Sequence, residues 1–190
     1  MLLAAGESRR MGAFKQLLKL GGKSFVERCV RALLHSHVRE VIVVTGYRAA
    51  DVSAELRGLP VRIEENPNYA LGMTSSIKCG VCAIGPNVGG CLIALADQPL
   101  ITTDTVDRLI QVFEDERPLI VVPTFGGKGG HPVILDMSLK KEILAMDPDR
   151  GLRQVTAANA ARTLRVELNT SSVLTDFDRP EDYLAFKDAL

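Results

Sequence analysis

No stretch of the sequence approaches the roughly 20 consecutive apolar residues that a membrane-spanning helix needs. The chain also lacks an excess of charge of either sign, because 23 Lys and Arg residues balance 23 Asp and Glu residues. That balance gives no support for general binding to nucleic acids or membranes, which a basic excess would favour.

The sequence is also poor in features of secreted proteins. Its four cysteines are too few and too unevenly spaced for a secreted disulfide scaffold. The start is apolar for only a few residues before it turns glycine-rich and basic, unlike a signal peptide. We therefore expect a cytoplasmic protein.

What the sequence does contain is a regular alternation of short apolar runs and helix-period segments. The runs lack polar alternation, as expected of strands buried on both faces of a sheet. We expect strands at Leu2–Ala4, Glu40–Thr45, Val61–Glu64, Cys91–Ala96 and Leu119–Pro123, and helices at Ser24–Ser36, Ala50–Arg57, Thr74–Ile84 and Thr103–Glu116. Ser24 and Thr103 are the expected N-caps of two of these helices.

This alternation predicts one α/β domain over residues 1–190, with three layers and a mostly parallel central sheet. After Pro123, the segment TFGGKGGHPVIL predicts a small antiparallel excursion. Helices at Ser138–Ala145 and Gly151–Ala158, a strand at Arg162–Glu167 and a helix from about Arg179 complete the prediction. The first strand is shorter than the usual length of about five or six residues, which is consistent with a truncated or misassigned start.

The segment after the first strand combines small residues with basic ones at the edge where open parallel sheets bind ligands. The small residues Ala4–Gly6 let the backbone approach a ligand, with amides that can face phosphate oxygens. Arg9, Arg10 and Lys15 supply cationic donors for the same anion. The segment is neither a Walker P-loop nor a Gly-x-Gly-x-x-Gly loop, so a plain connection remains the alternative to a phosphate site.

The order of residues in LAAGESRRMGAFK resembles a known signature, Leu-Ala-Ala-Gly-x-Ser-x-Arg-Met-Gly-x-x-Lys. It belongs to the MobA-like nucleotidyltransferases of the molybdenum-cofactor branch. Every fixed position is met, by Leu3, Ala4, Ala5, Gly6, Ser8, Arg10, Met11, Gly12 and Lys15. The resemblance implies that the loop wraps a nucleotide, with Leu3, Ala4, Ala5, Gly6, Ser8, Arg10 and Lys15 in contact with it. It also implies that Arg10 and Lys15 neutralise the phosphates.

A second informative segment, CLIALADQPLIT, brings a buried strand directly into Asp97. A carboxylate at this position can hold a Mg²⁺ ion that bridges phosphates, or it can simply begin the turn that Pro99 continues. The Asp-Gln-Pro triplet resembles that of the molybdopterin cytidylyltransferase-like subgroup. That resemblance implies that Asp97 is a Mg²⁺ ligand and a catalytic residue together with Arg10 and Lys15.

A second carboxylate is expected from LTDFDRPEDYL, which resembles the family's Asp-x-Asp-Thr-Pro-Glu-Asp segment with Arg179 in place of threonine. We expect Asp176 to face the metal. Asp178 is then expected to cap the helix that Pro180 begins.

Two further segments resemble the same family. Gly130-His131-Pro132 matches its Gly-His-Pro element, and His131 either contacts the substrate or has a structural role. Gly72, Met73, Ser75 and Ser76 match a Gly-Met-x-x-Ser segment. Gly72 and Ser75 then either bind nucleotide at a helix N-terminus or belong to an ordinary helix start.

Taken together, the resemblance implies a Rossmann-like nucleotidyltransferase fold and a Mg²⁺-dependent reaction. The enzyme would transfer CMP from CTP to molybdopterin and release pyrophosphate, and a molybdoenzyme would be a partner. GTP as the nucleotide, or another phosphorylated acceptor, remains open. Two other classes remain as well: a nucleotide-binding maturation protein with weak catalysis, and an oxidoreductase, which the missing dinucleotide fingerprint disfavours.

Overall fold

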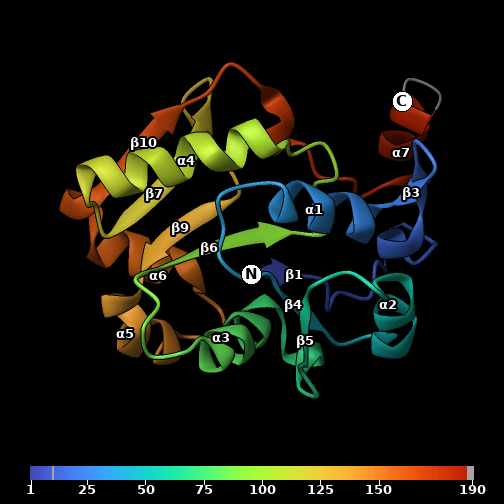
Figure 1. Ribbon diagram of the computed structural model, residues 1–190, viewed down its shortest axis with the longest axis horizontal. Helices are drawn as coiled ribbons and strands as arrows, with labels where there is room; N and C mark the ends of the chain where they lie inside the picture. The colour runs from blue at the N-terminus through green and yellow to red at the C-terminus, as the bar shows by residue number, and fades with distance from the viewer. Residues whose placement is uncertain (10, 188–190) are drawn as a thin grey trace.

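Short apolar runs rich in β-branched residues form the centre of the protein, because such residues fit a pleated surface that is buried on both faces. The computed structural model describes residues 1–9 and 11–187 (Figure 1). Within these residues the main sheet has the strand order β10-β7-β9-β6-β1-β4-β5, and β8 pairs with β7. Its strands are β1 (Leu2–Leu3), β4 (Ile42–Thr45), β5 (Arg62–Glu65), β6 (Gly90–Leu95), β7 (Ile120–Phe125), β8 (Lys128–Gly129), β9 (Val133–Asp136) and β10 (Thr163–Glu167).

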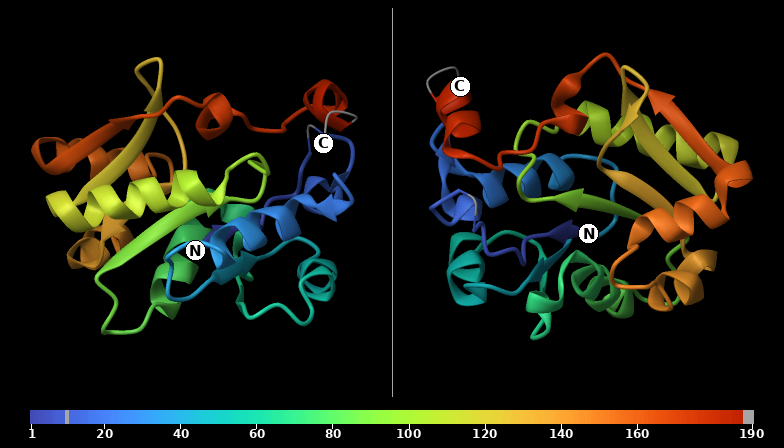
Figure 2. Two further views of the ribbon diagram at one scale, coloured as in Figure 1. Left: turned by 45° about the horizontal axis from the view of Figure 1, so that its top comes forward. Right: turned by 180° about the vertical axis from the view of Figure 1, so that it is seen from behind.

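Helices cover both faces of this sheet (Figures 1 and 2). They are α1 (Phe25–Leu34), α2 (Ala49–Glu55), α3 (Met73–Ala83), α4 (Thr103–Glu116), α5 (Lys140–Leu144), α6 (Leu152–Ala158) and α7 (Pro180–Lys187). Leu2 packs into one core with α1, α2 and α4, whereas Leu3 packs into a second core with α3, α5 and α6. The expected three-layer α/β fold is therefore confirmed.

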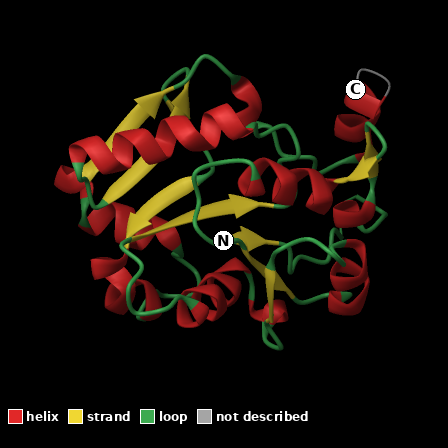
Figure 3. Cartoon of the chain, viewed as in Figure 1, coloured by secondary structure: helices red, strands yellow, loops and turns green. Residues whose placement is uncertain are grey.

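Most pairs in the sheet are parallel, and β9 is the exception at its centre. β1 runs parallel to β4 and β6, whereas β9 lies antiparallel between β6 and β7. β8 forms a short hairpin with β7, and Gly126 and Gly127 turn it with φ values of 57° and 75°. The antiparallel excursion after Pro123 is thus confirmed, and Figure 3 shows these strands among the helices.

The last part of the chain crosses back over the molecule. After β10 it passes through η5 (Ser171–Leu174) and reaches α7, which contacts a small hairpin of β2 (Lys19–Leu20) and β3 (Lys23–Ser24) (Figure 1). Leu20, Phe25 and Phe177 form a third, smaller core beneath it, in which all three are fully buried. The C-terminal segment is therefore anchored beside the start of α1.

A few local expectations were shifted. Ser24 caps α1 as expected and accepts from the N–H of Glu27, but the cap of α4 is Thr102 rather than Thr103. The helix expected at Ser138–Ala145 is divided into a 3₁₀ turn and α5.

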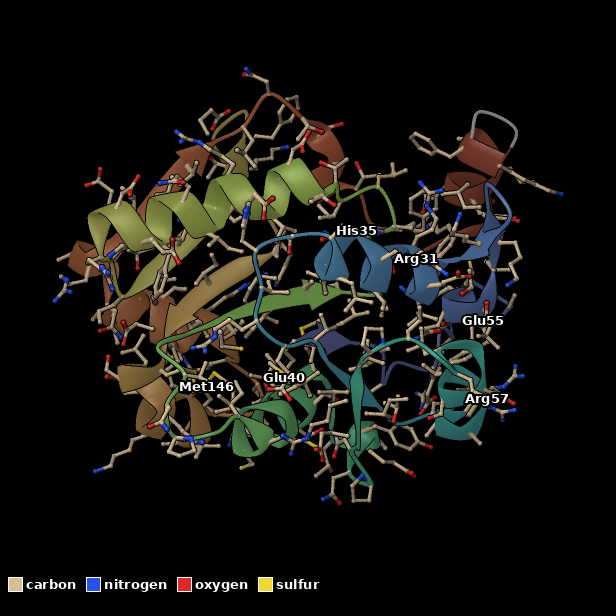
Figure 4. All side chains as sticks on the ribbon, viewed as in Figure 1. Arg31, His35, Glu40, Glu55, Arg57 and Met146 are labelled. Atoms are coloured by element: carbon tan, nitrogen blue, oxygen red, sulfur yellow. The ribbon has the colours of Figure 1, made fainter. Side chains whose placement is uncertain are left out.

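Side chains fill the space between the ribbons (Figure 4). Met146, after α5, is 1% exposed, and its carbonyl oxygen accepts from Lys78 Nζ of α3. In the described residues, no helix is long and apolar enough to cross a membrane.

Candidate active site

A pocket opens at the carboxyl ends of the neighbouring central strands β1 and β6. Leu3 pairs with Leu95, so the loop after β1 and Asp97 after β6 leave the sheet side by side. The residues that line the pocket include Leu3, Ala5, Gly6, Ser8, Lys15, Tyr69, Gly72, Ser76, Asp97 and Asp178. This is the edge at which open parallel sheets bind ligands.

Two polar side chains hold the loop after β1 in shape. Ser8, with a φ of 57°, accepts from the backbone N–H of Lys15 at 3.2 Å and donates to Gln16 Oε1 at 2.9 Å. Gln16 Nε2 donates to the carbonyl oxygen of Gly6 at 2.9 Å, and Gln16 is only 3% exposed. Because both ends of this buried amide are used within the loop, Gln16 fixes Gly6 relative to Lys15.

The Lys15 ammonium lies between two carboxylates. Its Nζ is 2.7 Å from Asp97 Oδ2 and 2.9 Å from Asp178 Oδ1, and the lysine side chain is 13% exposed. Burial lowers the pKa of Lys15, but the Asp97 and Asp178 carboxylates outweigh it, so the net pKa is raised. Lys15 therefore stays protonated, and its positive charge lies beside the glycine-containing loop.

The two carboxylates also suit a hard divalent cation. Asp97 Oδ1 is buried and has no hydrogen-bond partner within residues 1–9 and 11–187, which is costly unless a ligand satisfies it. Mg²⁺ usually takes one or two protein carboxylates, with phosphates and waters completing its shell. The described residues contain no group of three acidic, His or Cys side chains that could hold a metal. Asp97 and Asp178 therefore fit a cation that is also held by phosphates.

The segment that carries Asp178 is fastened to the end of β6. The N–H of Phe177 donates to the carbonyl oxygen of Asp97 at 3.0 Å, and the fully buried Phe177 ring packs edge-on against Phe25 at 5.0 Å between centroids. Gln98 Nε2 donates to Asp176 Oδ1 at 2.7 Å and to the Val173 carbonyl oxygen at 3.3 Å. The backbone of this segment therefore fixes where the Asp178 carboxylate points.

Residues 1–164 match the MobA-like NTP transferase domain. The chain belongs to this family. It is 25% identical to the molybdenum cofactor cytidylyltransferase of Escherichia coli, over 99% of this chain and 94% of that protein. It is 32% identical to the nicotine blue oxidoreductase of Paenarthrobacter nicotinovorans, over 80% of this chain and 78% of the relative. Among solved structures, a nucleotidyl transferase from Methanothermobacter thermautotroptrophicus superposes with a TM-score of 0.84 at 27% identity, covering 99% of this chain and 94% of that one.

The structure of this MobA-like chain brings many of the predicted residues together. Leu3, Ala5, Gly6, Ser8, Lys15, Gly72 and Asp97 all line the pocket. Ala4 is different, because its side chain packs into the core that Leu2 shares with α1, α2 and α4. Arg10, expected to neutralise phosphates, lies outside the described residues.

The two acidic residues near the C-terminus are arranged the other way round from the expectation. Asp178 lines the pocket and pairs with Lys15, whereas Asp176 faces the amide of Gln98. The physical reason is that Gln98, directly after Asp97, donates its amide to Asp176 and holds that carboxylate, whereas Asp178 pairs with Lys15. The first turn of α7 is instead bonded by Asp182, whose Oδ2 accepts from the N–H groups of Asp178 and Arg179.

The Gly-His-Pro element of the family does not line the pocket in the described chain. The N–H of His131 donates to the carbonyl oxygen of Val173 at 3.0 Å, and a Cβ placed on Gly130 would lie 2.0 Å from that same oxygen. His131 is half-buried, and the loss of solvation lowers the pKa of its imidazole. Here the element supports the start of the segment that carries Asp178.

The Gly-Met-x-x-Ser segment divides between the two interpretations. Gly72, with a φ of 95°, lies in the pocket at the start of α3. The Ser75 hydroxyl is engaged with Asn66 Nδ2 at 2.8 Å and with the local turn, and Ser76 rather than Ser75 lines the pocket. Ser75 is therefore part of the helix start.

Two pocket residues escaped the sequence reasoning. Gln16 offers no local signal, because its burial against Gly6 and Ser8 arises only in the folded loop. Tyr69 lines the pocket and packs over Gly46, where an added Cβ would lie 2.5 Å from the Tyr69 Cβ. No local motif marks that contact, because it joins separate segments.

We expect Gly130→Ala to disturb the segment that carries Asp178, because its methyl group would meet backbone rather than a movable side-chain end. Overpacking of this kind typically costs about 1–3 kcal/mol of the free energy of unfolding, which urea denaturation measures. Gly129→Ala is the matched control, since its nearest neighbours are side-chain atoms of Val122 and Arg165 at 3.2 and 3.4 Å. Equal stability of the two variants would contradict this role for Gly130.

Stability should also depend on pH through His131. Burial holds the pKa of folded His131 below the ordinary value of 6.5, so the unfolded chain binds the proton more readily. The free energy of unfolding therefore falls as the pH drops through 6.5 toward the folded pKa, and His131→Gln should remove part of that fall. Urea titrations across this range measure it, and His35→Gln, which removes an exposed imidazole, is the control. If the free energy of unfolding falls with pH as steeply in His131→Gln as in the wild type, His131 is not the source of the fall.

Proposed function

We propose that this MobA-like protein is a cytoplasmic nucleotidyltransferase that transfers CMP from CTP to molybdopterin and releases pyrophosphate. The observation that carries the proposal is the convergence of Lys15, Asp97 and Asp178 beside the loop after β1. The pocket thus combines a cation, two carboxylates and a close backbone, which together suit a triphosphate and its divalent cation.

Each group has a defined task in this proposal. The loop around Gly6 and the N-terminus of α3 at Gly72 bring backbone N–H groups to the triphosphate. Lys15 provides a positive charge for the phosphates, and Arg10 adds a second. Asp97 and Asp178 would hold Mg²⁺, which when bound screens the charge of the phosphates.

The reaction needs no side-chain nucleophile. An anionic oxygen of the acceptor's phosphate attacks the α-phosphorus of the nucleotide, and the bond from that phosphorus to the oxygen that bridges to the β-phosphate breaks. The electron pair leaves with pyrophosphate. The residues of the pocket therefore accelerate the step by positioning the two anions and by neutralising their charge.

The choice of CTP and molybdopterin has more limited support. It comes from the Asp-Gln-Pro and Gly-His-Pro elements and from the Escherichia coli relative, which is similar over nearly the whole chain. GTP, or another small phosphorylated acceptor, would use the same cluster of charges. The product of transfer to molybdopterin would pass to a molybdoenzyme.

We expect pyrophosphate release when the purified protein is incubated with Mg²⁺, molybdopterin and CTP, and not with the other nucleoside triphosphates. Asp97→Ala should lower kcat by about a hundredfold or more, because it removes a cation ligand from the pocket. Release with GTP alone would keep the chemistry and change the nucleotide. No release with any nucleotide and any phosphorylated acceptor would overturn the proposal and favour a binding protein.

A second experiment separates the two C-terminal carboxylates. Asp178→Asn should lower kcat by about tenfold to a hundredfold, because its oxygen faces Lys15 in the pocket. Asp176→Asn changes the same chemical group two residues away and should cost far less, since its partner is the Gln98 amide. The ratio of the two kcat values in the pyrophosphate assay decides the point. A larger loss in Asp176→Asn would indicate that Asp176, and not Asp178, holds the metal.

One observation favours a second candidate function. The Paenarthrobacter nicotinovorans relative, at 32% identity, is named an oxidoreductase. If this chain shared that chemistry, it would bind a nicotinamide or flavin cofactor. The absorbance and fluorescence of the purified protein, with and without added NADH, would reveal such a cofactor.

A further inference from the structure

The same two carboxylates face two different cations. In the structure, the Lys15 ammonium bridges Asp97 Oδ2 and Asp178 Oδ1 at 2.7 and 2.9 Å. In the proposed function, these carboxylates hold a divalent cation. An ammonium and a metal ion compete for these carboxylates, because Lys15 already occupies Asp97 Oδ2 and Asp178 Oδ1, which leaves Asp97 Oδ1 for the ion, and the two cations repel each other at such distances.

We propose that Lys15 excludes the free divalent cation from the empty pocket and admits it only together with a triphosphate. This inference rests on the proposed function. Without nucleotide, the ammonium pairs with both carboxylates, so a bare metal ion would have to displace it. A triphosphate changes the balance, because it offers Lys15 a new anionic partner.

The local geometry lets the ammonium move while its backbone stays in place. The N–H of Lys15 donates to Ser8 Oγ, and Ser8 is held in turn by the buried Gln16. The lysine side chain is a flexible four-carbon stem with a point charge at its end. The pocket that Gly6 and Gly72 line is next to the carboxylates, so a short swing of the stem would transfer the charge to a phosphate there.

A consequence is that the nucleotide and the divalent cation should bind cooperatively. By linkage, whatever factor the nucleotide adds to the affinity for the cation, the cation adds to the affinity for the nucleotide. The pocket therefore selects the metal–nucleotide pair over either ion alone. It also keeps a free metal ion from binding the carboxylates before the phosphates are present.

The decisive measurement is Mn²⁺ binding without nucleotide, followed by electron paramagnetic resonance of the free ion. We expect the wild type to bind Mn²⁺ weakly, and Lys15→Met to bind it at least about tenfold more tightly, because Asp97 and Asp178 lose their ion pairs with Lys15. Adding Asp97→Asn to Lys15→Met should abolish the gain, which locates the ion in this pocket. Lys15→Gln is the second variant, should the methionine variant fail to fold in a thermal melt.

Lys19→Met is the matched control. It also removes a lysine that pairs with one carboxylate, Glu55, but that pair lies at the end of α2, where Figure 4 labels Glu55, and the lysine is 53% exposed. Its Mn²⁺ affinity should equal that of the wild type.

The outcomes separate this inference from the function on which it rests. It is overturned if the wild type binds Mn²⁺ tightly without nucleotide, if neither Lys15 variant binds it more tightly, or if Asp97→Asn leaves the gain intact. None of these arms contains nucleotide, so they are independent of the pyrophosphate assay. A positive assay with unchanged Mn²⁺ affinity refutes the inference alone, whereas a negative assay refutes the function.

Discussion

The parallel register of β1 against β6 is the constraint on which the site depends. Leu3 lies opposite Leu95, so the segments that follow these two strands emerge at the same edge and at nearly the same height. One segment carries the small residues and Lys15, and the other begins with Asp97. A parallel pair shifted by two residues would keep the same faces buried and still separate the lysine from the carboxylate.

The second half of the site depends on a contact between distant parts of the chain. Phe177 is buried against Phe25 and bonded to the backbone of Asp97, and this fixes the direction of Asp178. The Val173 carbonyl oxygen accepts from both His131 and Gln98, so that three segments meet at one atom. The aromatic contact and these backbone bonds together hold Asp178 in the pocket, where it pairs with Lys15. The Gly-His-Pro element thus contacts the segment that leads to Asp178 and does not itself line the pocket.

Local sequence patterns predicted the alternation of elements, the layers, and the placement of Lys15 and Asp97, because each of these follows from a short run of residues. The loop after β1 and the end of β6 could be located without any knowledge of contacts. The allocation of Asp176 and Asp178 could not, since it depends on contacts with residues far away in the sequence: Gln98 binds Asp176, and Lys15 binds Asp178. Gln16 and Tyr69 were missed because their roles come from contacts made in the fold: Gln16 closes the loop after β1 onto Gly6, and Tyr69 packs over Gly46 from a separate segment.

The match to the family ends at residue 164, while Asp178 lies beyond it on the segment that returns to the pocket. Within the described residues this part of the chain adds no strand after β10, and it is attached through the buried Val173 against β7, through Phe177 and through α7. Evolution can therefore alter it without rebuilding the central strands. A change in this returning segment would therefore alter which groups face Lys15 and Asp97 while the strands that carry the rest of the pocket stay as they are.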